Sequence, residues 1–156
     1  MKKTINGFVA CRLGSTRVKF KNLLLLEGRP LFTYLTDNVL KSKKLDNLYL
    51  NTDSHHIINV AKEIYKDNLN YYLRPSNLGN SATKLDDYVF EFMNNVRSDI
   101  TIFFNPCCLF LKASTVDKAL EYFINNDLDS LCASRVAQTL CFLDNKPVNF
   151  LMNISQ

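Results

Sequence analysis

Apolar and polar residues along the chain fall into two kinds of segment that follow one another in turn. Five short segments predict strands, because an amphipathic helix needs a longer segment with a repeat of three or four residues. These segments are residues 5–11, 45–53, 69–73, 99–104 and 129–134, and the first of them is short and apolar as a buried strand requires. Four longer segments carry their apolar residues on one helical face and predict amphipathic helices. These segments are residues 29–42, 54–67, 82–96 and 115–126.

The apolar faces of the first three helices give expected core positions. They are Leu31, Leu35 and Val39, then Ile57, Ala61 and Ile64, and then Leu85, Val89 and Phe92. Pro30 suits the first turn of the first helix, and either Asp53 or Ser54 is expected to cap the second. Near the end of the chain, residues 140–143 and 147–151 predict either a hairpin or an extended arm.

The alternation of strands and helices predicts the fold class and the place of a ligand. It is typical of an α/β protein with three layers, in which a mainly parallel sheet lies between helices. We expect one domain over residues 1–156. Because ligands of such sheets bind beyond the carboxyl ends of the strands, the loops at residues 12–22, 74–81 and 105–111 are expected to converge on one crevice.

The first of these loops has unusual chemistry. It reads RLGSTRVKFKN and places Arg12, Arg17, Lys19 and Lys21 around Gly14 and two hydroxyl residues. Glycine lets backbone approach a ligand, and cations with hydroxyl groups bind anionic oxygens, so phosphate binding is favoured over a solvated turn. The spacing matches neither a P-loop nor a dinucleotide-binding glycine motif.

The composition limits the cellular compartments and the partners that are expected. The net charge of +4 suits a small anionic ligand but is too mild to indicate nucleic acid. The five cysteines are odd in number and form no CxxC pair, which argues against a disulfide framework or a zinc site and indicates a reducing cytoplasm. No apolar run reaches the roughly 18 residues of a membrane span, so no membrane partner is expected.

At this point the sequence resembles a known family. The stretch RLGSTRVKFKNL is similar to the first motif of the sugar-acid cytidylyltransferases, which make CMP-activated sialic acids and related 2-keto-3-deoxy acids. Arg12, Gly14, Ser15, Lys21 and Asn22 match that motif, and its R-L-x-S-T-R form is closer to the 3-deoxy-manno-octulosonate enzymes. Three further segments stand in the family's order, namely NTD at 51–53, RPSNLGNS at 74–81 and NPCCLFL at 105–111.

The resemblance implies a Rossmann-like nucleotidyltransferase fold and a specific reaction. The anomeric hydroxyl of a sialic-acid-like sugar attacks the α-phosphate of CTP, pyrophosphate leaves, and Mg²⁺ assists. By resemblance, Arg12 and Lys21 are the catalytic residues that hold the triphosphate. The expected nucleotide-binding positions are Cys11, Leu13, Gly14, Ser15, Asn22, Arg74 and Asn105. The expected partners are CTP, an acidic sugar and a second copy of the chain, in the cytoplasm.

The sequence also departs from the family. Ser81 stands where the family has aspartate, and Cys107 and Cys108 stand where it has threonine and serine. Family members extend well past residue 156, and the further part carries an Mg²⁺-binding aspartate and much of the dimer arm, so the chain is expected to be cut short. Within the chain, Asp53 is the candidate metal ligand.

Two classes of function stay open beside each other. The retained first motif favours an enzyme, either with a 2-keto-3-deoxy sugar acid or with another acceptor. The altered third and fourth motifs favour a non-catalytic nucleotide-binding or assembly module of the same fold.

Overall fold

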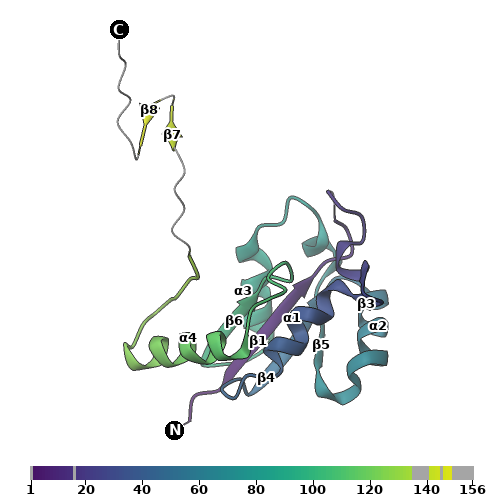
Figure 1. Ribbon diagram of the computed structural model, residues 1–156, viewed down its shortest axis with the longest axis horizontal. Coiled ribbons are helices and arrows are strands. Elements are labelled where there is room, and N and C mark those ends of the chain that lie inside the picture. Colours follow the sequence, from purple (N-terminus) through teal and green to yellow (C-terminus); the bar gives the residue numbers. More distant parts are fainter. Residues whose placement is uncertain (1, 16, 135–140, 145, 149–156) are drawn as a thin grey trace.

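Four parallel strands form the centre of the computed structural model, which describes residues 2–15, 17–134, 141–144 and 146–148 (Figure 1). Their order in the sheet is β5-β4-β1-β6. The strands are β1 (Ile5–Cys11), β4 (Asn47–Thr52), β5 (Asn70–Leu73) and β6 (Ile100–Phe104). All three pairings are parallel, as the sequence predicts, so the carboxyl ends of the four strands lie at one edge of the sheet.

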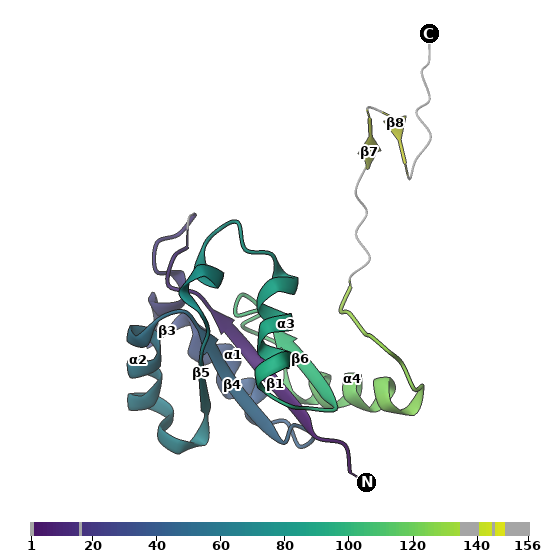
Figure 2. The same ribbon diagram turned by 180° about the vertical axis from the view of Figure 1, so that it is seen from behind.

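Helices cover both faces of the sheet and complete the predicted three layers. They are α1 (Leu31–Val39), α2 (His55–Tyr65), α3 (Leu85–Asn95) and α4 (Ala113–Asn125). Val9 of β1 belongs to the main core with residues of α1, α2 and α4. On the opposite face, Phe8 packs against Phe92 of α3 with ring centroids 4.4 Å apart, and Figure 2 shows α3 lying over that face. Because both faces are covered, β1 is apolar along almost its whole length.

Two expected core positions differ from the prediction. Ile64 is 44% exposed and Tyr65 is buried instead, because α2 is rotated so that the Tyr65 hydroxyl reaches α1. Leu85 is also exposed to solvent, because α3 begins at this residue beyond the sheet. The second helix is capped by Ser54, whose hydroxyl accepts a hydrogen bond from the Ile57 N–H, so the alternative cap Asp53 is left for another role.

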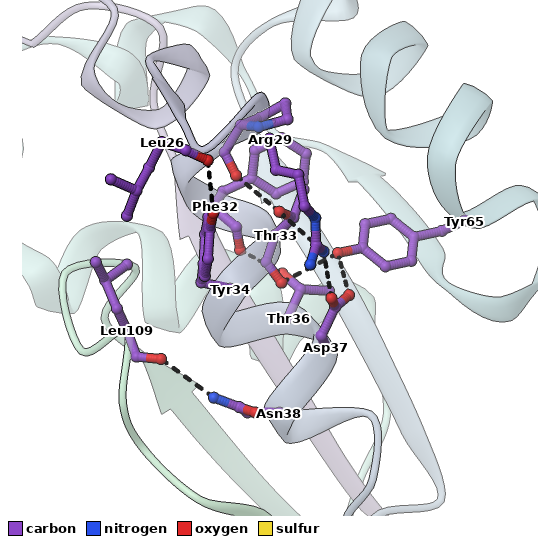
Figure 3. A network of polar contacts seen from close by, with 11 residues as sticks. Leu26, Arg29, Phe32, Thr33, Tyr34, Thr36, Asp37, Asn38, Tyr65 and Leu109 are labelled. Atoms are coloured by element: carbon purple, nitrogen blue, oxygen red, sulfur yellow. Dashed lines mark hydrogen bonds and ion pairs between the residues drawn. The ribbon is translucent and has the colours of Figure 1, made fainter.

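A polar network around α1 holds two neighbouring segments, the hairpin that precedes α1 and the loop that follows β6 (Figure 3). The Tyr65 hydroxyl donates to Asp37 at 2.7 Å, and Asp37 also forms an ion pair with Arg29. Arg29 belongs to the hairpin of β2 (Leu25–Leu26) and β3 (Arg29–Pro30), which continues directly from the first basic loop. The next residue of α1, Asn38, donates to the Leu109 carbonyl at 3.2 Å and so fixes the loop after β6.

The remaining short elements follow local backbone requirements. Glu27 and Gly28 both have positive φ and close the β2–β3 hairpin with the backbone twist that two-residue hairpins prefer. Three short 3-10 turns lie elsewhere, η1 (Lys21–Leu23), η2 (Lys66–Asn68) and η3 (Ser76–Gly79). In the described residues, every helix is too short or too polar to cross a membrane.

The strand predicted at residues 129–134 is absent, so this prediction is wrong. The segment is irregular and exposed, and it leads away from the sheet after α4 (Figure 1). An apolar run becomes a strand only where a neighbouring strand satisfies its backbone, and here none lies beside it among the described residues. Farther on, β7 (Phe142–Leu143) and β8 (Lys146–Pro147) pair antiparallel, which confirms the hairpin alternative there. The rest of the predicted arm, 149–151, lies outside the described residues.

Candidate functional site

A cleft of about 600 Å³ opens at the carboxyl edge of the sheet, beyond the ends of β1 and β6 and beside the loop that follows β5. All three predicted loops contribute to its walls, which confirms that they converge. Their contributions include Arg12, Lys21, Arg74, Asn80, Asn105 and Cys107. Parallel strands bring these loops together although they are distant in the sequence.

The cleft is lined by positive charge. Arg12, Arg17, Lys21 and Arg74 face it, and no carboxylate is among the described residues that line it. Lys19, the remaining cation of the first loop, is not part of the lining. A concave surface with cations of one sign attracts and holds an anion, so the arrangement is suited to a phosphate-bearing ligand.

Arg74 is held from three directions in the wall of the cleft. It is 3% exposed, it donates to the Asn51 side-chain oxygen at 3.2 Å, and its guanidinium lies 3.8 Å from the Asp53 carboxylate. The guanidinium also lies 4.9 Å from the centre of the Tyr88 ring. Burial lowers the pKa of Arg74, although Asp53 opposes this effect. Its Nε has no hydrogen-bond partner among the described residues, and a ligand in the cleft can supply one.

Asp53 connects the loops rather than facing the cleft. Its carboxylate accepts a hydrogen bond from the Leu13 N–H at 3.0 Å and pairs with Arg74. A Cβ atom at Gly79 would lie only 2.0 Å from Asp53 Oδ2, so glycine is needed there for close approach. Asp53 therefore joins the first basic loop, the end of β5 and the turn η3, and its metal-ligand role stays a prediction.

Asn22 and Arg12 make the hydrogen bonds that fix the first loop. Asn22 is 3% exposed, and its side-chain amide donates to the Arg12 carbonyl at 3.0 Å, while its Oδ1 has no partner among the described residues. The Arg12 guanidinium donates across the cleft to the Asn80 carbonyl at 3.1 Å. Asn22 therefore holds the backbone that presents Arg12, a positioning role that the sequence does not reveal.

The third loop brings a thiol to the basic loop. Lys21 Nζ lies 2.9 Å from Cys107 Sγ, within hydrogen-bonding distance for sulfur. Asn105 accepts a hydrogen bond from the Cys107 N–H through its side chain at 3.0 Å and from the Cys108 N–H through its carbonyl at 2.9 Å. Asn105 thus forms the turn that places Cys107 in the cleft.

The other expected nucleotide-binding residues lie at different depths. Ser15 lines the cleft, whereas Cys11, Leu13 and Gly14 do not. Burial raises the pKa of the Cys11 thiol to about 12, and Leu13 acts through its N–H on Asp53. A Cβ at Gly14 would meet open space, so packing does not require glycine there.

Tyr88 is the cleft residue that sequence reasoning missed. It lies in α3, lines the cleft and carries the Arg74 guanidinium on its ring. The signal that marks it is its position, an aromatic residue in the first turn of a helix whose amino end faces the predicted crevice.

The described residues hold no cluster of metal-ligating side chains, and the expected Mg²⁺ stays a prediction. No three histidine, cysteine, aspartate or glutamate side chains among them come together as metal ligands. Mg²⁺ is bound in proteins through one or two carboxylates together with phosphate oxygens, and the described lining of the cleft offers no carboxylate.

Comparison with known proteins gives one consistent answer. The sequence model of the family described as cytidylyltransferase matches residues 7–147. A pseudaminic acid cytidylyltransferase of Campylobacter jejuni (serotype O:2) is 29% identical over 136 residues, 81% of this chain and 56% of that protein. A Helicobacter pylori protein, named as a pseudaminic acid cytidylyltransferase and a UDP-sugar hydrolase, is 30% identical over 105 residues, 67% of this chain and 19% of its own length. The chain spans about half the length of the first of these relatives.

Solved structures share the fold. A CMP:2-keto-3-deoxy-manno-octonic acid synthetase complexed with CTP superposes with a TM-score of 0.70 at 17% identity, covering 80% of this chain and 48% of that one. A 4-diphosphocytidyl-2C-methyl-D-erythritol synthase also gives 0.70, at 10% identity, covering 96% and 70%. These identities are low, so the likeness concerns the fold, and it confirms the expected Rossmann-like nucleotidyltransferase architecture.

Proposed function

Because this chain belongs to the cytidylyltransferase family, we propose that its cleft binds CTP and that the protein transfers CMP to an acidic sugar. In this reaction the anomeric hydroxyl of the sugar attacks the α-phosphate, a new O–P bond forms, and pyrophosphate leaves. The observation that supports this proposal most directly is the lining of the cleft. Four cations face it from two loops, and none of the described lining residues is acidic.

Catalysis by this chain rests on positioning and charge neutralisation. Arg12 and Lys21 hold the triphosphate and stabilise the negative charge that moves onto the departing pyrophosphate. Ser15, on the same loop, adds a hydrogen-bond donor. Asn22 keeps the Arg12 backbone in place before the ligand arrives, so little reorganisation is needed during the reaction.

The second loop recognises the nucleoside. Arg74 is fixed by Asn51, Asp53 and Tyr88, so its guanidinium can meet the edge of cytosine without losing side-chain freedom. Asn105 also lines the cleft, and we place the ribose and the acceptor sugar beside it. We therefore assign base recognition to the loop after β5 and acceptor binding to the loop after β6.

The acceptor, the assembly and the compartment follow from the relatives and the composition. The C. jejuni and H. pylori relatives are named for pseudaminic acid, and we assign a sugar acid of this nonulosonic class to this protein. We also assign it a homodimeric state and the cytoplasm, a reducing compartment that suits the free thiols in the described part of the chain.

Nucleotide binding gives the direct test. The melting temperature is followed with CTP, UTP, ATP or GTP, because a ligand that binds only the native state stabilises it. We expect a rise selective for CTP that is reduced in Lys21→Ala and Arg12→Ala, each weakening affinity by roughly tenfold to a hundredfold. Lys19→Ala is the matched control, since it removes one cation of the same loop from outside the cleft. Equal shifts with all nucleotides, or an unchanged shift in both cleft variants, would contradict the proposal.

A non-catalytic nucleotide-binding module is the second candidate. It is favoured by the altered third and fourth motifs, where Ser81, Cys107 and Cys108 replace the family's residues, and by the lack of a carboxylate for Mg²⁺ in the described lining of the cleft. Product formation separates the two. CTP, an acidic sugar and the protein are combined with Mg²⁺, and pyrophosphate release is measured. Selective CTP binding without pyrophosphate release from any 2-keto-3-deoxy sugar acid would favour the module.

A further inference from the structure

The cleft holds a thiol that the transfer of CMP does not use, beside a lysine that the proposed transfer does use. Cys107 is exposed, lines the cleft, and has its sulfur 2.9 Å from Lys21 Nζ. Its backbone N–H is tied to the Asn105 side chain, so the thiol is held in place on its turn. Its neighbour Cys108 is also exposed but does not line the cleft. The two thiols are adjacent in sequence and differ in surroundings.

The surroundings of Cys107 favour an anionic or strongly hydrogen-bonding group. Arg12 and Lys21 face the same space, and two buried side-chain atoms in the lining, Asn22 Oδ1 and Arg74 Nε, have no partner among the described residues. Cations near a sulfur stabilise the charge that appears on an oxygen leaving group during attack by that sulfur. Reactive thiols in proteins characteristically lie in such accessible, electropositive places.

We propose that Cys107 is an oxidation site within the cleft, where a peroxide converts its thiol to a sulfenic acid with Lys21 as the assisting cation. The sulfur supplies two electrons, an S–O bond forms, and the O–O bond of the peroxide breaks. The departing hydroxide takes up the thiol proton, so one thiol and one hydrogen peroxide give one sulfenic acid and one water. Two further thiols restore the original state: the first condenses with the sulfenic acid to a disulfide and water, and the second reduces that disulfide, which releases the Cys107 thiol and a disulfide of the two added thiols.

The consequence of this reaction rests on the proposed function. Lys21 is assigned to the triphosphate, so oxygen added to Cys107 engages the same ammonium group and occupies the same space. Oxidation therefore closes the cleft to CTP, and bound CTP shields the thiol. The pair acts as a reversible switch that turns nucleotide binding off under oxidising conditions.

The test measures how fast each thiol is oxidised. Protein is treated with hydrogen peroxide and a 1,3-dicarbonyl probe that traps sulfenic acids, and labelled peptides are quantified by mass spectrometry. Since no lysine or arginine lies between Arg97 and Lys112, both thiols fall in one tryptic peptide, so Cys107→Ser and Cys108→Ser assign the label. We expect Cys107 to be labelled about tenfold faster than Cys108, corresponding to one charge-assisted contact.

Lysine variants identify the cause. Lys21→Ala should lower the rate at Cys107 to that of Cys108, Lys21→Arg should restore much of it, and Lys19→Ala should leave it unchanged. Equal rates at the two cysteines, or a rate that does not respond to Lys21→Ala, would overturn the proposal. This outcome leaves the melting-temperature test of CTP binding unaffected.

Nucleotide protection separates the inference from the proposed function. We expect saturating CTP to slow labelling of Cys107, and oxidised protein to regain its CTP-dependent stabilisation after treatment with dithiothreitol. Fast, Lys21-dependent labelling that CTP does not slow supports the oxidation site and counts against nucleotide binding in this cleft.

Discussion

The carboxylate of Asp53 lies in the space that a side chain at Gly79 would occupy, with Oδ2 only 2.0 Å from the position of an added Cβ. The same carboxylate binds the Leu13 N–H and pairs with Arg74. Two of the loops that build the cleft, residues 12–22 and 74–81, are therefore fastened to one acidic side chain. The arrangement explains why the walls of the cleft keep their relative positions although separate segments build them.

Gly79→Ala is expected to loosen this connection. The added methyl group displaces Asp53 from Leu13 and Arg74, so the free energy of unfolding should fall by about 1–3 kcal/mol. CTP affinity should fall with it, because the first basic loop loses an anchor. Urea denaturation measures the loss of stability. Gly14→Ala is the control, since a Cβ there meets open space and should change stability by less than about 0.5 kcal/mol.

Asp53→Asn is expected to keep the shape of the side chain at position 53 and to remove its negative charge. Arg74 would then be a buried cation without its nearby carboxylate, which costs on the order of 3 kcal/mol of stability. Thermal and chemical denaturation give the value. The double variant Asp53→Asn with Arg74→Met should recover part of the loss, because it no longer buries an unpaired charge. Failure of the second substitution to recover stability would show that the ion pair is not the source.

Tyr65→Phe tests the network that supports the β2–β3 hairpin (Figure 3). The substitution removes the hydroxyl that donates to Asp37 at 2.7 Å and leaves the ring in the core. We expect a loss of about 1 kcal/mol, typical of one hydrogen bond, with little effect on CTP affinity. Tyr34→Phe is the comparison, since its hydroxyl donates to the Leu26 carbonyl within the hairpin. Equal stability of Tyr65→Phe and the parent protein would contradict this account.

Asp117 gives a prediction for acid pH. Its burial alone would raise the pKa, but hydrogen bonds from the Ser42 hydroxyl and from backbone N–H groups outweigh this, so the pKa of Asp117 is lowered from its ordinary value in the folded protein. A carboxylate with a depressed pKa stabilises the fold above its unfolded pKa, and this contribution is lost as pH falls through the folded pKa.

The measurement is unfolding free energy against pH for the parent protein and Asp117→Asn. At pH 6 the variant should be less stable by about 0.5–1 kcal/mol, a modest value because the carboxylate is partly exposed. The difference should shrink below pH 4 and disappear at lower pH. Asp129→Asn, at an exposed position, should give no such difference at any pH.

Sequence patterns predicted the parts of the fold that depend on neighbouring residues and on the order of strands and helices along the chain. The apolar run of β1 has the bounds expected for it, and the parallel order brings the three loops together as predicted. Residues 129–134 show the limit of this reasoning, because an apolar composition cannot indicate whether a partner strand lies beside it. Ile64 and Tyr65 show a second limit, since a small rotation of α2 exchanges the two neighbours at the edge of its buried face.

For the candidate site, the sequence predicted where the residues lie better than it predicted which contacts they make. Arg12, Lys21 and Arg74 line the cleft as expected, because charge at a strand end is visible in the sequence. The tie between Asp53 and Gly79 and the contact between Lys21 and Cys107 join segments from different loops. Such contacts depend on how the loops meet, which no local pattern specifies.

The order of the strands has a consequence for how the protein is made. β1 lies between β4 and β6, and Ile5 pairs with Ile100. During synthesis β1 leaves the ribosome first, yet one of its edges stays open until β6 emerges, so the growing chain carries an unpaired apolar strand. The turn that bears Asn105 and Cys107 emerges later still. The cleft is therefore completed only after the central sheet has closed, and a nascent chain presents no finished cleft before that moment.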